Sequence, residues 1–510
     1  MRTIKWILVG ALLGVATLPY LLFQQRELPA GTSLKSDAYE YSEAKLLIDR
    51  TMWDESTQQI VRSHHIFDAI LAEIEAAETF VIADFFLWNP WRGAIEASGE
   101  LRGLSEELAN ALIRKRIQHP EMPILVITDP INRIYGEHAP DYYERLAGAG
   151  IPVVFTDLSQ MPDSNLVYAP QVWFWGQYWS PNHPLGEWRL IPNPFDSLGE
   201  KLSLSELSRL LYFKANHRKV LITGRLSGAP RALVGSFNPA DGSANHSNVA
   251  ALVDGAVAIY AAHSELAVAE WSSADLQQVQ GPLGEATRRA IIEIRERLPA
   301  ADSLPEARAD RPSVAWRSEG AIQNELLAQL DQAGAGSRID VAIFYFSDRR
   351  IVRAFHTAIQ RGARVRLLMD ANRDAFGREK NGIPNRMVAA ELLQQASGTG
   401  GVEVRWAATH GEQYHAKVLR VVGPQQNVLY LGSANWTRRN LNDLNLEANL
   451  IFQDDVELGR EFDRYFTTLW TNAEAYEESL PYGDWSEEGW SLRWKTWLYR
   501  FQEWSGASTF

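Results

Sequence analysis

The chain has 510 residues, of which 46% are hydrophobic and 22% are charged. This length exceeds one ordinary core, so two domains or two large halves are expected, and the composition excludes an intrinsically disordered chain. The net charge of −13 argues against a protein that holds nucleic acid by bulk electrostatics. The absence of cysteine from the sequence excludes disulfides, thiolate catalysis and cysteine-bound metals.

The N-terminus carries basic residues followed by an apolar run. Arg2 and Lys5 precede the run from Trp6 to Phe23, which is just long enough to span a bilayer. Basic residues before such a run favour a cytoplasmic N-terminus. We therefore predict a transmembrane helix at residues 1–24, with a cleaved signal peptide as the alternative. Both interpretations place the remaining chain outside the cytoplasm, on the periplasmic side if the source is bacterial.

Helices then alternate with short apolar strands, twice in the same order. The periodicity predicts helices over 63–77, 104–117 and 141–149, with buried strands over 79–87, 124–129 and 151–155. Later in the chain it predicts helices over 321–333 and 348–361, with strands over 339–346 and 365–370. This alternation is typical of an α/β fold with mostly parallel sheets flanked by helices.

The repeat also suggests where the chain divides. We place the first half at residues 45–273 and a linker with one helix at 274–312. The second half follows at 313–475, and an aromatic tail occupies 476–510.

Two segments fall outside the repeat and are rich in aromatic residues. Residues 168–188 form either a loop packed on the domain or a lid over an apolar substrate. In the tail, aromatic residues recur at helical spacing, so one face of a helix is almost wholly aromatic. That face either packs on the protein's own surface or contacts a bilayer interface. The five residues are Trp490, Trp494, Trp497, Phe501 and Trp504.

Two short motifs each occur twice. His-x-Lys stands at 217–219 and 415–417, and Gly-Ser-x-Asn stands at 235–238 and 432–435. The offsets are 198 and 197 residues, so the two motifs keep their register. One His-x-Lys alone is as consistent with an ordinary surface strand as with a site. The paired copies within a duplicated pattern indicate two similar halves that share an active site.

These residue types suit the chemistry of a phosphate ester. Alternate residues of a strand share one face, so the histidine and lysine of each motif lie side by side. Lysine neutralises an anionic substrate, and histidine serves as nucleophile or as acid. If the half-sites face each other, one histidine attacks phosphorus while the other protonates the leaving oxygen. Two lysines and two asparagines then stabilise the charge, so we predict neither a metal nor a cofactor.

The double motif resembles the phospholipase D superfamily over about residues 60–470. The resemblance implies two half-domains related by a pseudo-two-fold axis, an active site between them and a phosphohistidine intermediate. By position it implies His217 and His415 as nucleophile and general acid/base. It also implies that phosphate is held by Lys219, Lys417, Asn238 and Asn435, with support from Ser236 and Ser433.

The sequence departs from the family at one motif position. An aspartate follows each lysine in the family, but Gly224 and Val422 stand there in this chain. The resemblance assigns that aspartate a structural role more than a chemical one, so its loss leaves the nucleophile in place. Its absence is nevertheless the evidence for an inactive scaffold that kept the fold.

The family also carries an acidic residue after the motif that orients a catalytic histidine. Glu447 takes that place in the second half, and residues 248–250 (Asn-Val-Ala) correspond to 445–447, so only one such carboxylate is present. The resemblance implies pairing across the interface, so that Glu447 would serve His217. We therefore predict His217 as the nucleophile and His415 as the acid.

The predicted anchor, the aromatic segments and the negative net charge all favour a lipid phosphodiester. We predict a membrane-bound phosphatidyltransferase or phospholipase D-type hydrolase of the cardiolipin synthase-like kind, with membrane phospholipid as substrate. The bilayer would be its partner through the N-terminal helix and the aromatic C-terminal helix.

An extracytoplasmic nuclease of the same superfamily is the alternative enzyme, although nucleic acid is disfavoured as a partner. Its support would be a basic strip made of Lys214, His217, Arg218, Lys219, Arg349, Arg350, Arg353, Arg438 and Arg439.

Overall fold

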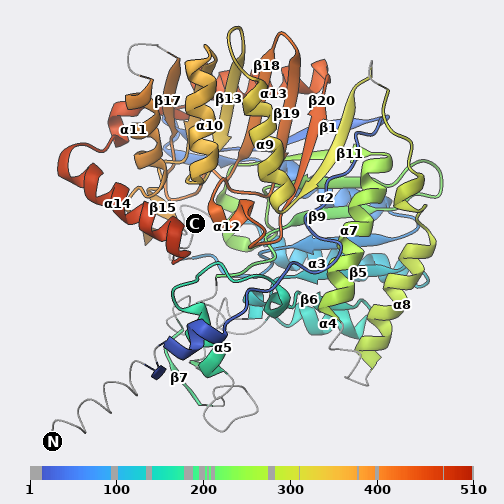
Figure 1. Cartoon of the computed structure of the whole chain (residues 1–510). Helices are drawn as coiled ribbons and strands as arrows, with labels where there is room; N and C mark the ends of the chain where they lie inside the picture. The colour runs from blue at the N-terminus through green and yellow to red at the C-terminus, as the bar shows by residue number, and fades with distance from the viewer. Residues whose placement is uncertain are drawn as a thin grey trace, which may run out of the picture.

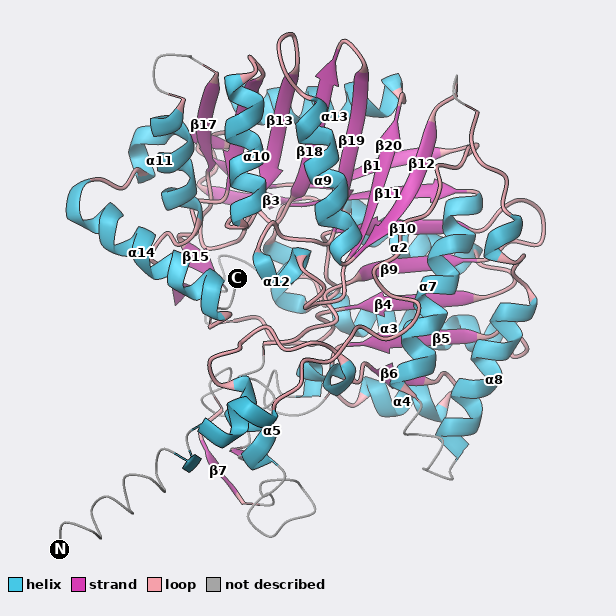
Figure 2. Cartoon of the chain, in the orientation of Figure 1, coloured by secondary structure: helices cyan, strands magenta, loops and turns pink. Residues whose placement is uncertain are grey.

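Two β-sheets with flanking helices form the body of the protein (Figures 1 and 2). The structure is a computed structural model. It describes residues 14–15, 17–93, 101–133, 140–176, 188–193, 201–203, 206–207, 213–273, 282–308, 311–375, 378–396, 401–474 and 476–507.

The first sheet has seven strands in the order β1-β11-β10-β9-β4-β5-β6. Most of their residues are buried apolar side chains, as the short apolar runs of the sequence predict. The strands are β1 (Ala44–Asp49), β4 (Val81–Phe85), β5 (Ile124–Thr128), β6 (Val153–Phe155), β9 (Lys219–Thr223), β10 (Arg231–Gly235) and β11 (Asn248–Asp254).

The second sheet has eight strands in the order β12-β20-β19-β18-β13-β14-β17-β21. Its first seven positions repeat the order of the first sheet, so each strand has a counterpart in the other half. The strands are β12 (Ser313–Ser318), β13 (Arg338–Ile343), β14 (Arg364–Met369), β17 (Val402–Ala407), β18 (Lys417–Gly423), β19 (Gln426–Gly432), β20 (Ala448–Gln453) and β21 (Ser479–Pro481).

Strand pairing corrects the prediction of mostly parallel sheets. In the first sheet the parallel pairs are β4–β5 and β5–β6, and in the second they are β13–β14 and β14–β17. The other pairs within the two sheets are antiparallel, so both sheets are mixed. The prediction was wrong because strands buried on both faces show the same apolar run whichever way their neighbours point.

Three hydrophobic clusters build the core. One lies between the first sheet and its outer helices, and one between the second sheet and its outer helices. The third contains side chains from both sheets and from α7, α8 and α13, so the two halves share a central core. The helices are α2 (His65–Ala76), α3 (Leu104–Gln118), α4 (Tyr142–Gly148), α5 (Ala169–Gly176), α7 (Ala256–Ser272), α8 (Pro282–Glu296), α9 (Gly320–Gln332), α10 (Arg349–Gln360), α11 (Asn385–Gln395), α12 (Arg438–Leu441), α13 (Val456–Thr471) and α14 (Gly489–Ser505).

A buried arginine also links the halves. Arg218 stands between the histidine and lysine of the first motif, and its guanidinium is fully buried. It pairs with Glu265 of α7 at 3.1 Å and with Glu319, just before α9, at 2.7 Å. Because removing one partner would leave uncompensated buried charge, this triad holds the first motif firmly against the second half.

The predicted N-terminal transmembrane helix is corrected by the structure. Within the described ranges, every helix is too short or too polar to cross a membrane. Residues 1–13 and 16, which make up much of the predicted segment, lie outside those ranges.

The helical periodicities predicted for the sequence are confirmed, including α14 in the aromatic tail. Of the aromatic segment at 168–188, residues 169–176 form α5, while 177–187 lie outside the described ranges. The proposed boundaries of the halves and the linker stay a prediction.

Candidate active site

The two His-x-Lys motifs lie where the halves meet, and each histidine is held by the backbone of the other half. Each lysine begins a strand, β9 or β18, and the histidine stands two residues earlier. His217 donates its backbone N–H to Leu446 O at 2.9 Å, and His415 donates to Ser247 O at 2.8 Å. The motifs are therefore positioned by contacts between halves as well as by their own strands.

Two buried aspartates fix the residue before each histidine. Asp129 Oδ2 accepts the backbone N–H of Asn216 at 2.7 Å, and Asp370 Oδ2 accepts that of Tyr414 at 2.8 Å. Both carboxylates follow the equivalent strands β5 and β14. The structure thus gives both aspartates the same positioning role.

His217 is paired with a carboxylate from the other half. Its Nδ1 lies 2.8 Å from Oε1 of Glu447, a fully buried residue just before β20. Glu447 also accepts the Ser433 hydroxyl and the Asn440 amide. Because a carboxylate accepts at Nδ1, the neutral imidazole carries its proton there and Nε2 keeps a lone pair. His217 is therefore held in the tautomer of a nucleophile.

His415 has a different environment. Its Nδ1 lies 2.9 Å from Ser236 O and 3.1 Å from Asn248 Oδ1. Both atoms accept hydrogen bonds, so Nδ1 is again the donor and Nε2 keeps the lone pair. Neither acceptor is charged, so the two histidines differ in electrostatics although their geometry is similar.

The structural counterpart of Glu447 is Asn248, two residues from the position given by the motif offset. The Ser236 hydroxyl donates to Asn248 Oδ1 at 3.0 Å, as the Ser433 hydroxyl donates to Glu447. The alignment that placed Ala250 opposite Glu447 was therefore wrong. Ser236 lies 12 residues before Asn248, whereas Ser433 lies 14 residues before Glu447. An alignment that assumes equal spacing in the two halves therefore misses this match. Asn248 is thus a site residue that the sequence analysis did not single out.

Both motif lysines are buried beside their histidines. Lys219 Nζ donates to His217 O at 2.6 Å, and Lys417 Nζ donates to His415 O at 2.7 Å. Burial lowers the pKa of Lys219 to about 7, and burial with the nearby positive charge of Lys219 lowers the pKa of Lys417 well below its ordinary value. Crowded, desolvated ammonium groups of this kind favour an anionic ligand.

The same crowding acts on the histidines. Burial lowers the pKa of His217 to about 4, while the negative charge of Glu447 acts in the opposite direction. Burial lowers the pKa of His415 well below its ordinary value, and the charges of Lys417, Lys219 and His217 add to this. Each half therefore carries a lysine whose positive charge lowers the pKa of the histidine in the other half. A phosphodiester anion between them would relieve the repulsion and raise these pKa values.

A phenylalanine lies against each histidine. The ring of Phe86 is 4.8 Å from that of His217, and the ring of Phe344 is 5.0 Å from that of His415. Each phenylalanine follows an equivalent strand, β4 or β13, and a motif lysine lies 5.0 Å from its ring. The sequence analysis missed this pair, although its matching place after two equivalent strands was a usable signal.

The asparagines of the Gly-Ser-x-Asn motifs are also at the junction. Asn238 Oδ1 accepts the backbone N–H of Leu87 at 3.2 Å. Asn435 Oδ1 is buried and has no hydrogen-bond partner in the described structure. The Asn435 side chain is therefore suited to contact a ligand by rotating its amide group. Phosphate binding by the asparagines and serines stays a prediction. No cluster of histidine and carboxylate side chains within the described ranges is arranged to hold a metal ion.

The positions of the missing aspartates lie far from this junction. Gly224 and Val422 are each five residues beyond the motif lysine, which is roughly 16 Å along a strand. A Cβ atom at Gly224 would stand 2.0 Å from the Thr79 hydroxyl and 2.5 Å from the Phe80 ring. The surrounding chain has closed over the space that an aspartate would need, so the departure from the family leaves the site geometry intact.

Restoring the aspartate should therefore do harm. Gly224→Asp is expected to lower the free energy of unfolding by about 1–3 kcal/mol through overpacking, without raising turnover. Urea denaturation and a turnover assay check this. Val422→Asp, at the half-buried equivalent position, is the matched control and should cost less. An increase in turnover for Gly224→Asp would contradict the structural reading of this position.

Comparisons with known proteins agree with the double motif. The sequence family described as "Cardiolipin synthase, PLD-like domain" matches residues 326–470. The mitochondrial cardiolipin hydrolase of Mus musculus is 29% identical over 175 residues, covering 34% of this chain and 69% of the relative. The enzyme of the same name from Canis lupus familiaris is 27% identical over 205 residues, covering 39% of this chain and 72% of the relative.

A solved structure shares the fold over nearly the whole chain. The phosphatidylserine synthase of Haemophilus influenzae Rd KW20 aligns with a TM-score of 0.52 and 13% identity, covering 92% of this chain and 94% of that one. The duplicated motifs, the paired half-sites and the sequence matches support the phospholipase D superfamily of phosphodiesterases and phosphatidyltransferases as the family of this chain, and the solved structure shows a shared fold.

Proposed function

We propose that this protein cleaves or transfers a phospholipid phosphodiester through a phosphohistidine intermediate. The observation that carries the proposal is the crossed pair of histidines at the junction of the halves. His217 is bound at Nδ1 by a carboxylate of the other half, and His415 is bound at Nδ1 by neutral acceptors. A nucleophile with a carboxylate partner and an acid without one are the two groups that displacement at phosphorus through a covalent intermediate needs.

In the first step, Nε2 of His217 attacks phosphorus and the bond from phosphorus to the leaving oxygen breaks. The electron pair passes to that oxygen, which takes a proton from Nε2 of His415. In the second step, water or an alcohol gives its proton to Nε2 of His415 and its oxygen attacks phosphorus, while the N–P bond breaks and its electron pair returns to Nε2 of His217. Lys219 and Lys417 would neutralise the phosphoryl oxygens in both steps. Water as acceptor gives hydrolysis, and a lipid alcohol gives transfer.

A phospholipid is favoured as substrate by two observations. The relatives named mitochondrial cardiolipin hydrolase act, by their name, on a phospholipid. The basic residues that a nuclease would use are largely engaged within the protein. Lys214 pairs with Asp163 at 2.7 Å, and Arg349 pairs with Glu391 at 2.6 Å. Arg218 is fully buried. These residues therefore offer little positive charge to a long polyanion.

The test is to mix the full-length protein with labelled phosphatidylglycerol and, separately, with single-stranded DNA. We expect a product from the lipid and none from the DNA, and we expect His217→Ala to abolish it. His119→Ala, at an exposed histidine on the end of α3, is the matched control and should keep activity. Cleavage of DNA alone would move the protein to the nuclease alternative. No product from either substrate would contradict the proposal and favour the inactive scaffold.

A further inference from the structure

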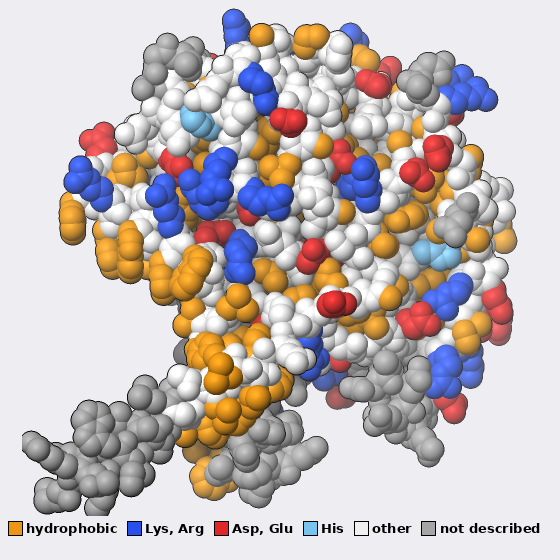
Figure 3. Space-filling model, viewed as in Figure 1, with side chains coloured by type: hydrophobic (Ala, Val, Ile, Leu, Met, Phe, Trp, Pro, Cys, Tyr) orange, Lys and Arg blue, Asp and Glu red, His pale blue; other side chains and the backbone are white. Residues whose placement is uncertain are grey.

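The outward face of α14 is a continuous row of aromatic side chains. Four tryptophans and one phenylalanine, between 41% and 80% exposed, occupy it, and we call it the aromatic face. From the second residue onward, successive ring centroids lie 5.3, 5.7 and 6.0 Å apart; the first two of these pairs are stacked and the third is tilted. Figure 3 shows this row at the edge of the molecule. The residues are Trp490, Trp494, Trp497, Phe501 and Trp504.

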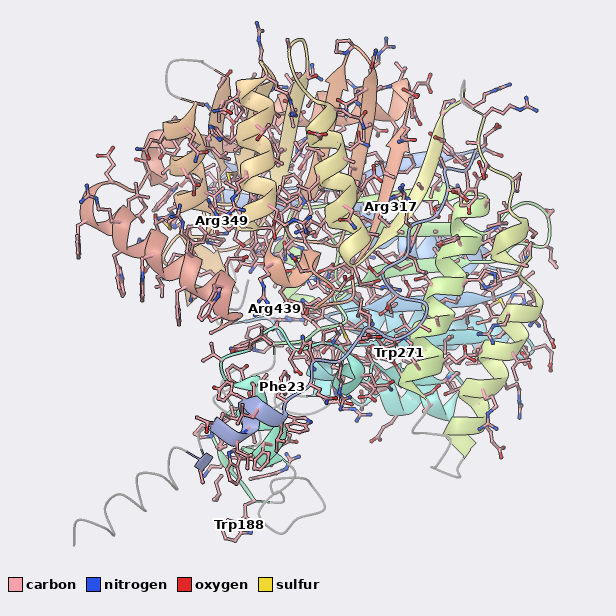
Figure 4. The ribbon with its side chains drawn as sticks, in the orientation of Figure 1. Phe23, Trp188, Trp271, Arg317, Arg349 and Arg439 are labelled. Carbon is pink, nitrogen blue, oxygen red and sulfur yellow. The ribbon has the colours of Figure 1, made fainter. Side chains whose placement is uncertain are left out.

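Polar contacts hold the opposite side of the helix against the protein. Tyr499 is buried, and its hydroxyl accepts at 2.6 Å from Nη1 of Arg349, the first residue of α10, which Figure 4 labels. Buried Glu503 accepts the Ser347 hydroxyl and the backbone N–H of Arg438, the latter at 3.1 Å. A helix on a water-soluble surface usually buries its apolar side and exposes its polar side. Leu492, Leu498 and Tyr499 already pack the inner side of α14 on the core of the second half. The aromatic face is a second apolar side, which the protein's own surface leaves uncovered.

The surroundings of the aromatic face extend the same character. Near the C-terminal end of α14, Arg438 Nη1 donates a hydrogen bond to Ser164 O at 3.0 Å. The segment around Ser164 and the N-terminal segment beside it both expose apolar side chains. Phe23 and Trp173 join the N-terminal and α5 segments, with ring centroids 6.0 Å apart. Figure 3 shows hydrophobic surface from α14 into this region. Its exposed members include Leu21, Leu22, Leu166, Val167 and Trp173.

The charges on α14 are mainly basic. Arg493 and Arg500 are exposed beside the aromatic face, and Arg493 makes no ion pair within the described ranges. The acidic residue of the helix, Glu503, is buried. Tryptophan favours the boundary between lipid head groups and acyl chains, and basic residues beside it favour anionic head groups.

We propose that the aromatic face docks on the surface of a phospholipid bilayer, with α14 lying in the plane of the interface. A second copy of the chain is the weaker occupant. In a symmetric pair of copies the same patch meets itself, so the exposed Arg493 and Arg500 would lie near their own like charges, whereas anionic head groups complement them. The proposal goes beyond the proposed chemistry, because docking does not require turnover.

Docking would also orient the candidate site. The C-terminal end of α14 contacts α12, where Arg439 Nη2 donates to Gly506 O at 3.1 Å (Figure 4). α12 begins three residues after Asn435 of the second Gly-Ser-x-Asn motif. A bilayer held by α14 therefore lies next to the loop that carries this motif.

A local probe tests the contact in the full chain. Because the sequence has no cysteine, Trp490→Cys can be labelled with a single polarity-sensitive fluorophore. On addition of phosphatidylglycerol vesicles we expect a blue shift and quenching by a lipid-borne quencher. Leu226→Cys, at an exposed position in the loop after β9, is the control and should not respond. Vesicle binding with a silent Trp490→Cys label would overturn the proposal. A concentration-dependent shift without vesicles, as from contact between copies, would also overturn it.

Substitution gives an independent measurement. Trp494→Ser combined with Trp497→Ser is expected to weaken flotation with the vesicles by about tenfold for each ring removed. The matched control combines Ile117→Ser and Leu226→Ser, which are exposed apolar residues away from α14. Equal binding by both double variants would overturn the proposal. Turnover of a short-chain lipid in solution should be unchanged in the α14 variant, so failure of the proposed chemistry and failure of docking are distinguishable.

Discussion

His217→Ala is expected to lower turnover by about 10⁴-fold or more and to eliminate the phosphoenzyme, because the attacking nitrogen is gone. His415→Ala is expected to lower turnover of a phospholipid by about 10²–10⁴-fold, because it removes only proton transfer. The two variants can be told apart with a phosphodiester whose leaving group is a nitrophenolate, because that group departs without needing a proton from His415. His415→Ala should then release nitrophenol in the first step and accumulate phosphoenzyme, whereas His217→Ala should do neither.

Rapid mixing with acid quench, followed by detection of acid-labile phosphate on the protein, measures this contrast. The reverse pattern, with phosphoenzyme in His217→Ala and none in His415→Ala, would exchange the two roles. The control is wild-type protein with the same substrate, in which the phosphoenzyme should form and then decay.

Asn248→Asp is expected to give His415 the carboxylate that His217 already has, with a shift in the pH profile. A negative charge at this distance raises the pKa of an imidazole by about 1–3 units. The acid must be protonated, so activity falls as pH rises through its pKa. Raising the pKa of His415 therefore moves the alkaline limb of kcat/KM to higher pH. Asn248→Ala, which removes the acceptor without adding charge, should lower the rate without this upward shift.

Glu447→Gln is the complementary change. It removes the charge that opposes the effect of burial on His217, so the pKa of His217 should fall further below about 4. The nucleophile must be unprotonated, so the acidic limb should move to lower pH. The rate should fall by about 10²–10⁴-fold, because the imidazole loses its oriented partner. If Asn248→Asp moved the acidic limb and Glu447→Gln moved the alkaline one, the assignment of nucleophile and acid would be reversed.

Much of the site could be predicted from the sequence because its motifs are local. Each histidine stands two residues before the lysine that begins a strand, and each serine and asparagine follow directly after the next strand. Such short segments of chain keep these side chains near one another wherever the sheet lies. Their duplication in register predicts a site between two halves, and the structure brings both motifs to that junction. The strands and helices were also predictable, since their hydrophobic periodicity is a property of short segments.

Contacts between distant residues could not be predicted in the same way. The match of Asn248 to Glu447 depends on hydrogen bonds to Ser236 and Ser433, and a two-residue difference in spacing concealed it. The pairing of β9, β10 and β11 is antiparallel although their apolar runs resemble those of parallel strands. In each case the partner is chosen by the packing of the sheet, which segment composition does not encode.

The sequence by itself determined the duplicated motifs, the order of helices and strands, and the aromatic stripe of the tail. Only the tertiary structure decided which way that stripe faces, because the bonds of Tyr499 and Glu503 to distant residues turn it outward. It likewise decided that Gly224 has no room for a side chain, and that one histidine faces a carboxylate while the other faces an amide. The physical reason is common to all three. Periodicity and spacing follow from covalent geometry along the chain, whereas orientation, space and charge depend on neighbours that only folding brings together.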